Sequence, residues 1–302
     1  MFKSKNSMSR ALVRRETTAG YLFLLPSLFF FVTFVLYPMF LCIYTSFFDS
    51  NMGKNAVDVF VGLGNYKELF QDKLFLGALK NTVLIVVVAV PTVCAFSLWV
   101  ATAIYDMKPA LTSAFRCIFY LPVVTGSVAV TVVWKWMYNN RYGVFNYLFK
   151  GLGIIDQNIN WLGDARFALW CIILILFTTS VGQPIVLYVS ALGNVDHSLV
   201  EAAEVDGANR RQVFWKIKWA QIMPTTLYIL IITTINSFQC FALIQLLTSG
   251  GPTHSTDTIM YYIYYTAFKL YRYGYGNAMG VVLMVIIAVL SAVQFKLGQR
   301  SD

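Results

Sequence analysis

The sequence predicts an all-α, polytopic membrane protein with six transmembrane helices, and three observations carry this prediction. Of its 302 residues, 58% are hydrophobic and only 12% are charged, against about 45–50% and about 25% in soluble domains. Six apolar runs are each long enough to cross the hydrocarbon core, which takes ~20 helical residues. Within these runs one ionisable side chain stands out, that of Lys135. A soluble enzyme and a disordered chain are both excluded, because each needs more charge.

The six predicted spans cover residues 21–47, 82–105, 117–138, 167–192, 225–247 and 274–295. The first is too long for the core of a signal peptide, and no small-residue cleavage site follows it, so we interpret it as an uncleaved anchor. Lys135 lies near the end of the third span, where its long side chain is expected to reach the interface. Several spans contain proline, which membrane helices tolerate when neighbouring helices satisfy the freed carbonyls. The prolines therefore indicate a helix bundle.

The basic residues set the expected orientation. The tail before the first span, the second and fourth loops and the C-terminus together carry 13 of the 23 lysines and arginines. Loops rich in lysine and arginine stay in the cytoplasm, so both termini are predicted to be cytoplasmic. The net charge of +9 then reflects basic residues held near anionic lipid, and no nucleic-acid partner is expected.

The middles of the spans contain no Asp, Glu, Lys, Arg or His. Ion-driven carriers place such groups inside the membrane as relays, so their absence argues against one. The chain has no G-x-x-x-x-G-K-[ST] loop for binding ATP. Its five cysteines lack C-x-x-C spacing and its two histidines lie far apart, so neither a metal site nor a catalytic cluster is expected.

Neutral polar residues mark the fourth and fifth spans. In the fifth, Thr233, Asn236, Ser237 and Cys240 fall at i, i+3, i+4 and i+7, which is one helical face, and Gln239 is close by. The fourth holds Thr178, Thr179, Ser180, Gly182 and Gln183 just before Pro184. Such residues hydrogen-bond helix to helix, or line a passage for a neutral polyhydroxyl solute. Both interpretations stay open, and they are compatible at different residues.

The loop of residues 193–224 is predicted to form two short helices with a bend between them. Residues 201–204 favour helix, and Asp206-Gly207 interrupts it because glycine permits a backbone bend. A helical pattern resumes at Asn209. Small alanines allow another protein to approach, and the Glu201 carboxylate suits an arginine of a partner. An amphipathic helix lying on the membrane is the alternative.

This loop resembles the EAA loop of bacterial ABC-importer permeases, whose pattern is E-A-A, three residues, G, nine residues, I-x-L-P. The matching positions are Glu201, Ala202, Ala203, Gly207 and Ile217, while Trp-Ala at 219–220 departs from Leu-Pro. Segments 20–38, 60–70 and 247–280 resemble further motifs of the family. The sequence is thus identified as similar to the first permease subunit of carbohydrate importers of the maltose and glycerol-phosphate type.

The resemblance implies a type I ABC importer permease fold and a multi-subunit machine in the bacterial inner or plasma membrane. The expected partners are a second homologous permease, two cytoplasmic ABC ATPases, an extracytoplasmic solute-binding protein, a sugar and membrane lipid. ATP and magnesium are expected in the ATPases, and this chain is expected to bind no cofactor and to be no enzyme. It would form half of the pathway and work by alternating access.

The resemblance also assigns residues. Contact with the ATPase is expected at Glu201, Ala202, Ala203, Asp206, Gly207 and Ala208. The substrate pathway is expected at Thr178, Gly182, Gln183, Thr233, Asn236, Ser237 and Gln239. The solute is predicted to be a sugar, and the alternatives are a non-sugar solute such as a phosphorylated polyol, or a self-sufficient carrier.

The expected division is a cytoplasmic tail (1–20), the permease domain (21–297) with its 193–224 loop, and a cytoplasmic tail (298–302). The tyrosines between residues 261 and 275 are interpreted as an interfacial aromatic belt, with docking of the binding protein as the alternative. Asp257, Lys269 and Arg272 are expected to add rim contacts.

Overall fold

A computed structural model describes residues 3–50 and 58–298, with side chains from residue 16 onward, and most of this part is helical. The elements are α1 (Lys3–Phe31), the π-helical η1 (Val32–Leu36), α2 (Tyr37–Thr45), β1 (Phe48–Asp49), β2 (Val59–Phe60), α3 (Gly64–Leu69), α4 (Lys73–Ile104), α5 (Pro109–Val124), α6 (Ser127–Met137), α7 (Val144–Gly151), α8 (Ala168–Ser180), α9 (Gly182–Gly193), α10 (His197–Val205), α11 (Arg210–Val213), the π-helical η2 (Phe214–Lys218), α12 (Trp219–Phe238), α13 (Ala242–Leu247), α14 (Ile259–Tyr264), the π-helical η3 (Tyr265–Lys269) and α15 (Tyr273–Gly298).

Five stretches of the described chain are long and apolar enough to cross a membrane, and the bent pair of α5 and α6 adds a sixth if it is counted as one span. The five are Glu16–Thr45, Lys73–Ile104, Ala168–Gly193, Arg210–Leu247 and Tyr273–Gly298. The third predicted span, 117–138, is corrected, because α5 and α6 meet there at 95°. Thr125 and Gly126 between them are extended, with ψ of 128° and 140°. Neither a β-branched residue nor glycine favours helix, so the chain breaks at this pair.

The fifth predicted span is also broken. α12 ends at Phe238 and α13 begins at Ala242, so Cys240 does not share a helical face with Thr233 as predicted. The carbonyl of Cys240 instead accepts a hydrogen bond of 2.8 Å from the Thr258 hydroxyl. A hydroxyl from the next segment thereby satisfies a backbone group that the broken helix leaves open.

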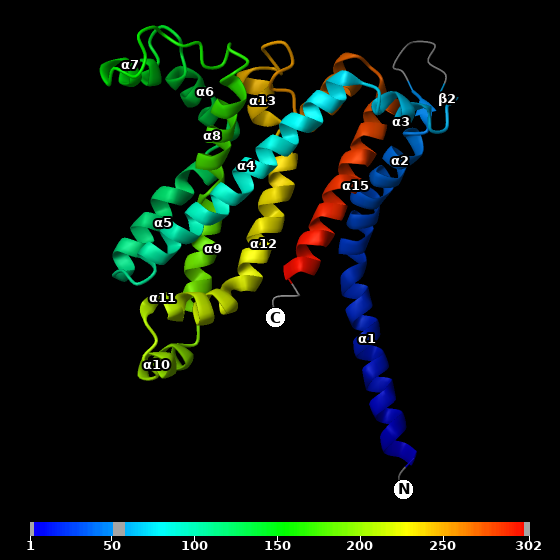
Figure 1. The fold of residues 1–302 in the computed structure, drawn as a ribbon. Coiled ribbons are helices and arrows are strands. Elements are labelled where there is room, and N and C mark those ends of the chain that lie inside the picture. The colour runs from blue at the N-terminus through cyan, green and yellow to red at the C-terminus, as the bar shows by residue number, and fades with distance from the viewer. Residues whose placement is uncertain (1–2, 51–57, 299–302) are drawn as a thin grey trace.

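The first span contacts the rest of the structure at its α2 end, which packs on α15, and there the Asn277 amide donates to the Thr45 hydroxyl at 2.7 Å. Between Glu16 and Thr45 no side chain is buried, and α1 runs away from the bundle (Figure 1). Helix α1 begins at Lys3 and so includes most of the predicted 1–20 tail. The predicted 298–302 tail begins with Gly298, the last residue of α15, and its other residues lie outside the described part of the chain. α1, α10 and the C-terminal end of α15 point toward one end of the bundle (Figure 1). The opposite end, which carries α3, α7 and α13, is called the distal end below.

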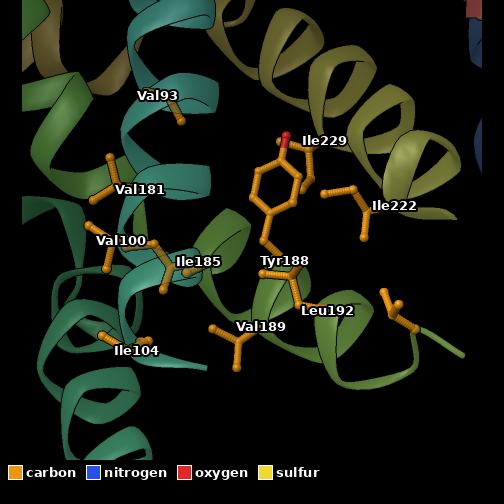
Figure 2. Packing of buried hydrophobic residues seen from close by; sticks show 12 residues of the cluster. Val93, Val100, Ile104, Val181, Ile185, Tyr188, Val189, Leu192, Ile222 and Ile229 are labelled. Atoms are coloured by element: carbon orange, nitrogen blue, oxygen red, sulfur yellow. The ribbon is translucent and has the colours of Figure 1, made fainter. Parts of the chain in front are cut away.

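A core of buried side chains joins α4, α9 and α12. Tyr188 of α9 points between α4 and α12 and lies near Ile229 (Figure 2). Lipid is as apolar as these residues, so van der Waals packing holds them together rather than exclusion of water. Gly182 brings α5 against α9, because a Cβ there would lie only 2.3 Å from the carbonyl oxygen of Phe119.

A carboxylate fastens the distal end. Asp72 caps α4 by accepting from the Leu74 amide at 2.8 Å. Its other oxygen accepts from the hydroxyls of Tyr262 and Tyr275 at 2.7 and 2.9 Å. These bonds join α4, α14 and α15, so the tyrosine belt predicted for 261–275 is in part wrong: Tyr261, Tyr262 and Tyr275 are buried.

Candidate functional site

A cavity of about 150 Å³ lies between α5, the α8–α9 span and α12. It is lined by Val123, Thr179, Ser180, Gln183, Pro184, Leu187, Tyr228, Ile229, Ile232, Thr233 and Asn236. None of these lining residues carries a charge, and the amides of Gln183 and Asn236 are exposed. Ligand pockets usually exceed about 300 Å³. Because this cavity is smaller, we interpret it as part of the wall of a passage rather than as a closed binding site.

The structure places three of the predicted pathway residues in this cavity and four outside it. Gln183, Thr233 and Asn236 line it. Gly182 is buried against Phe119 of α5. The others do not line it either: Thr178 donates to the Ile175 carbonyl at 2.8 Å, Ser237 is buried and Gln239 is exposed at the end of α12. Thr179, Ser180 and Tyr228 join the set.

The first helix of the 193–224 loop has defined ends. Asp196 caps α10 by accepting from the Ser198 amide at 2.9 Å and from its hydroxyl at 2.8 Å. The hydrogen bonds from Ser198 lower the pKa of the Asp196 carboxyl. At the other end Gly207 has φ +83°, and the amides of Gly207 and Ala208 donate to the Glu204 and Ala203 carbonyls at 3.1 and 2.9 Å. This is a Schellman motif, which needs a left-handed residue at the position of Gly207.

The second helix begins directly after this bend. Asn209 and Gln212 form a reciprocal capping box with two bonds of 2.9 Å, which satisfies two orphan amides at the start of α11. The two arms enclose a hollow of about 310 Å³. It is lined by Ala203, Asp206, Gly207, Ala208, Gln212, Val213, Lys216 and Ile217.

The predicted contact residues therefore divide into two groups. Ala203, Asp206, Gly207 and Ala208 line the hollow. Glu201 and Ala202 lie on an exposed part of α10 outside it. Val205 is 88% exposed and Trp215 is also exposed, so the loop presents apolar side chains beside its small residues.

Two contacts that sequence reasoning missed hold the loop to the bundle. The Lys218 ammonium hydrogen-bonds the Tyr105 hydroxyl and lies 4.6 Å from the centre of its ring, which joins η2 to the end of α4. Gln221 accepts from the Asp196 amide at 3.0 Å. The partners are 113 and 25 residues apart, so no local pattern announces either contact.

The segment 248–259 at the distal end is hydrogen-bonded to α4. The Thr82 hydroxyl of α4 accepts from the Ile259 amide at 2.9 Å. Asp257, predicted as a rim contact, is buried, and its carboxylate lies 2.7 Å from Nδ1 of His254. Burial raises the pKa of the Asp257 carboxyl, although His254 opposes the shift. Arg272, predicted at the same rim, forms a two-pronged ion pair with Glu68 at 2.8 Å.

In the part of the chain that the structure describes, no three His, Cys, Asp or Glu side chains come together as metal ligands would. The predicted site residues line two hollows, the cavity beside α12 and the hollow of the 193–224 loop.

Comparison with known proteins identifies the family. Residues 73–302 match the model of the family described as binding-protein-dependent transport system inner membrane component, and the chain belongs to this family. It is 33% identical over 94% of its length to the probable ABC transporter permease protein YesP of Bacillus subtilis, 91% of which is covered. It is 32% identical over 94% of its length to the lactose transport system permease protein LacF of Rhizobium radiobacter, with 95% of that chain covered.

A solved structure agrees with the fold. A chain of a bacterial alginate ABC transporter, crystallised with an alginate pentasaccharide-bound periplasmic protein, superposes with a TM-score of 0.81 at 24% identity. The match covers 95% of this chain and 96% of that one. The sequence-based prediction of a type I ABC importer permease fold is confirmed, and the chain is a multi-pass membrane protein of the ABC permease class.

Proposed function

We propose that this chain forms half of the translocation pathway of an ATP-driven, binding-protein-dependent importer whose solute is a neutral sugar. The observation that carries the choice of solute is the cavity beside α12, whose polar groups are amides and hydroxyls without a charge. Hydroxyls of a sugar can be matched by such groups without burying an ion. A phosphorylated polyol would leave its charge without a cation in this wall, so the sugar is favoured.

A second permease is proposed as the partner that completes the pathway. The cavity is too small to enclose a solute by itself. No side chain of the first span between Glu16 and Thr45 is buried within this chain. Both features are expected of a subunit whose opposite wall is supplied by a homologous chain. A solute-binding protein is proposed at the distal end, which is then the outer side, with both termini in the cytoplasm.

The ATPase is proposed to bind the 193–224 loop. Its hollow, lined by Ala203, Asp206, Gly207 and Ala208, accepts a side chain of the partner, and Glu201 outside the hollow offers a carboxylate for an arginine. ATP and magnesium are held by that partner, where hydrolysis takes place. Closure of the ATPases on ATP would move the loop and turn the pathway between inward and outward access.

The experiment that tests the machine is purification of the tagged chain from native membranes in mild detergent, with mass spectrometry of its companions. We expect a second six-span permease, an ATPase with a P-loop and a secreted sugar-binding protein. Recovery of the chain alone, still moving solute without ATP, would mean a self-sufficient carrier instead.

Two variants test the assigned residues. Glu201→Lys should abolish stimulation of ATP hydrolysis by the loaded binding protein, while Glu16→Lys, the same charge change at an exposed position of α1 away from the distal end, should not. Asn236→Ala should raise the solute concentration for half-maximal transport without changing assembly. If Asn236→Ala alters only assembly, the residue serves helix packing and its place in the pathway is refuted.

A further inference from the structure

The connection between α6 and α8 forms a compact unit at the distal end. Asn146 of α7 organises it, since its amide donates to the Ile159 carbonyl at 3.0 Å and its oxygen accepts from the Ile159 amide at 3.1 Å and the Trp161 indole at 3.0 Å. A row of aromatic rings packs together in the same unit, with successive centres 4.8 to 6.1 Å apart. The row runs through Tyr138, Phe145, Phe149, Trp161 and Phe167.

One face of α7 packs on this unit and the other is bare. Asn146 is buried, whereas Tyr147 is 81% exposed, Leu148 is exposed and Leu152, which ends the helix, is 70% exposed. Isolated exposed apolar residues need no explanation, but a contiguous group on one helical face does. The helix runs across the direction of the spanning helices at the distal end (Figure 1), which is the posture of a helix lying in a membrane interface.

Exposed aromatic side chains also lie at the near ends of the adjoining spans. Trp136 at the end of α6 and Trp170 near the start of α8 are exposed on either side of the unit. The row of aromatic rings and α8 together line an almost wholly apolar groove of about 200 Å³. It is lined by Tyr138, Phe145, Phe149, Trp161, Phe167, Trp170, Cys171 and Leu174. Tryptophans flanking an apolar groove at a span end are typical of the lipid interface.

The charges of the unit suit phospholipid headgroups. Lys135, Arg141 and Lys150 are exposed and make no ion pair among the described residues. Of its two carboxylates, Asp156 is exposed and Asp164 is bound to Arg166 at 2.7 Å, whose hydrogen bonds lower the pKa of Asp164 to about 2. Three free cations thus face one free carboxylate among the described residues. A helix with an apolar face binds at the boundary between headgroups and acyl chains, and cations beside it add attraction to phosphate headgroups.

We propose that α7 is an interfacial membrane helix whose apolar face, formed by Tyr147, Leu148 and Leu152, contacts phospholipid of the leaflet at the distal end. The unit then fixes the depth at which α6 and α8 sit in the bilayer. This goes beyond transport itself, because it assigns a lipid-contacting surface to a connection that carries no part of the pathway.

Photo-crosslinking tests this proposal without removing a packed side chain. p-Benzoylphenylalanine is placed at Tyr147 or at Leu152, and in a control at Gln157, an exposed polar position of the same unit. Cells expressing each full-length chain are irradiated, and the purified chain is weighed by mass spectrometry. We expect a phospholipid adduct at both Tyr147 and Leu152 that is several-fold more abundant than at Gln157.

Three results would overturn it. An adduct with another polypeptide at Tyr147 and Leu152 would make this face a docking surface for the binding protein or the second permease. Lipid adducts at equal levels from all three positions would show that no face is selected. Absence of lipid adducts at Tyr147 and Leu152 would place α7 in water.

Discussion

Substitution of Gly207, at the bend of the 193–224 loop, tests whether the ATPase needs the bent backbone, because a side chain there changes the backbone preference without a steric clash. Gly207 holds φ at +83°, and a Cβ built there meets no heavy atom within 4 Å. Gly207→Ala therefore costs only the left-handed backbone, about 1–2 kcal/mol for a residue with a side chain. Gly207→Asn should cost less, because asparagine visits this region more readily than alanine.

This cost converts into an affinity. Each 1.4 kcal/mol is tenfold in an equilibrium constant, so the bent loop loses about 5- to 30-fold in population relative to unbent forms. If the ATPase binds the bent form alone, its apparent affinity falls by up to that factor for alanine and by less for asparagine. The assay is titration of the ATPase onto the purified permease complex, followed by ATP hydrolysis in proteoliposomes with loaded binding protein.

The matched control is Gly153→Ala. Gly153 also has a positive φ, +69°, and open space around its Cβ, but it lies at the distal end. It should carry a similar backbone cost and leave ATPase binding unchanged. The reasoning is refuted if Gly207→Ala binds the ATPase as tightly as the native chain, or if the alanine and asparagine variants lose equally.

Three further outcomes are expected. Gly182→Ala should lower the free energy of unfolding in detergent by about 1–3 kcal/mol, as overpacking does, because the added Cβ would meet the Phe119 carbonyl. An unchanged melting temperature would contradict this close approach. Thr258→Val should lower the free energy of unfolding by about 1–3 kcal/mol, because the Cys240 carbonyl loses its hydrogen-bond donor. This variant should melt at a lower temperature, whereas Thr258→Ser should melt like the native chain. Burial alone would raise the pKa of Asp72, but its hydrogen bonds lower it overall. Its contribution to stability is therefore present above about pH 4 and lost as the pH falls further. Asp72→Asn should remove this part of the decrease in melting temperature at acid pH. The same decrease in both chains would contradict the hydrogen bonds of Asp72.

The spans were predictable because apolar runs of sufficient length have one solution in a bilayer, a helix. The breaks were not predictable in the same way. The pair Thr125 and Gly126 carries a local signal that a hydropathy run hides. The end of α12 depends on Thr258, which lies 18 residues away from the carbonyl it satisfies, and no window of sequence contains both partners.

At the candidate sites too, features set by local sequence were predictable and features set by distant contacts were not. The bend at Gly207 was predictable from Asp-Gly within a helical pattern, because a left-handed turn is a property of one residue. The wall of the cavity was only partly predictable. Gln183, Thr233 and Asn236 line it, but Gly182 beside them serves the packing of α5, and the helical period alone does not tell which neighbour a residue faces. The tyrosine belt was partly wrong because Asp72, far away in sequence, turns two phenols inward.

The core of α4, α9 and α12 connects the 193–224 loop to the cavity wall, so it indicates how movement of the loop would reach the pathway. α9 enters the 193–224 loop and α12 leaves it, and both pack on α4 through residues such as Tyr188, Ile222 and Ile229. Lys218 adds a polar fastening to Tyr105 at the end of α4. The same two helices carry the cavity wall, with Gln183 on α9 and Asn236 on α12. A packed core of this kind moves as a body rather than deforming. We therefore expect loop and wall to move together, so that access changes by displacement of this unit against the opposite wall of the pathway.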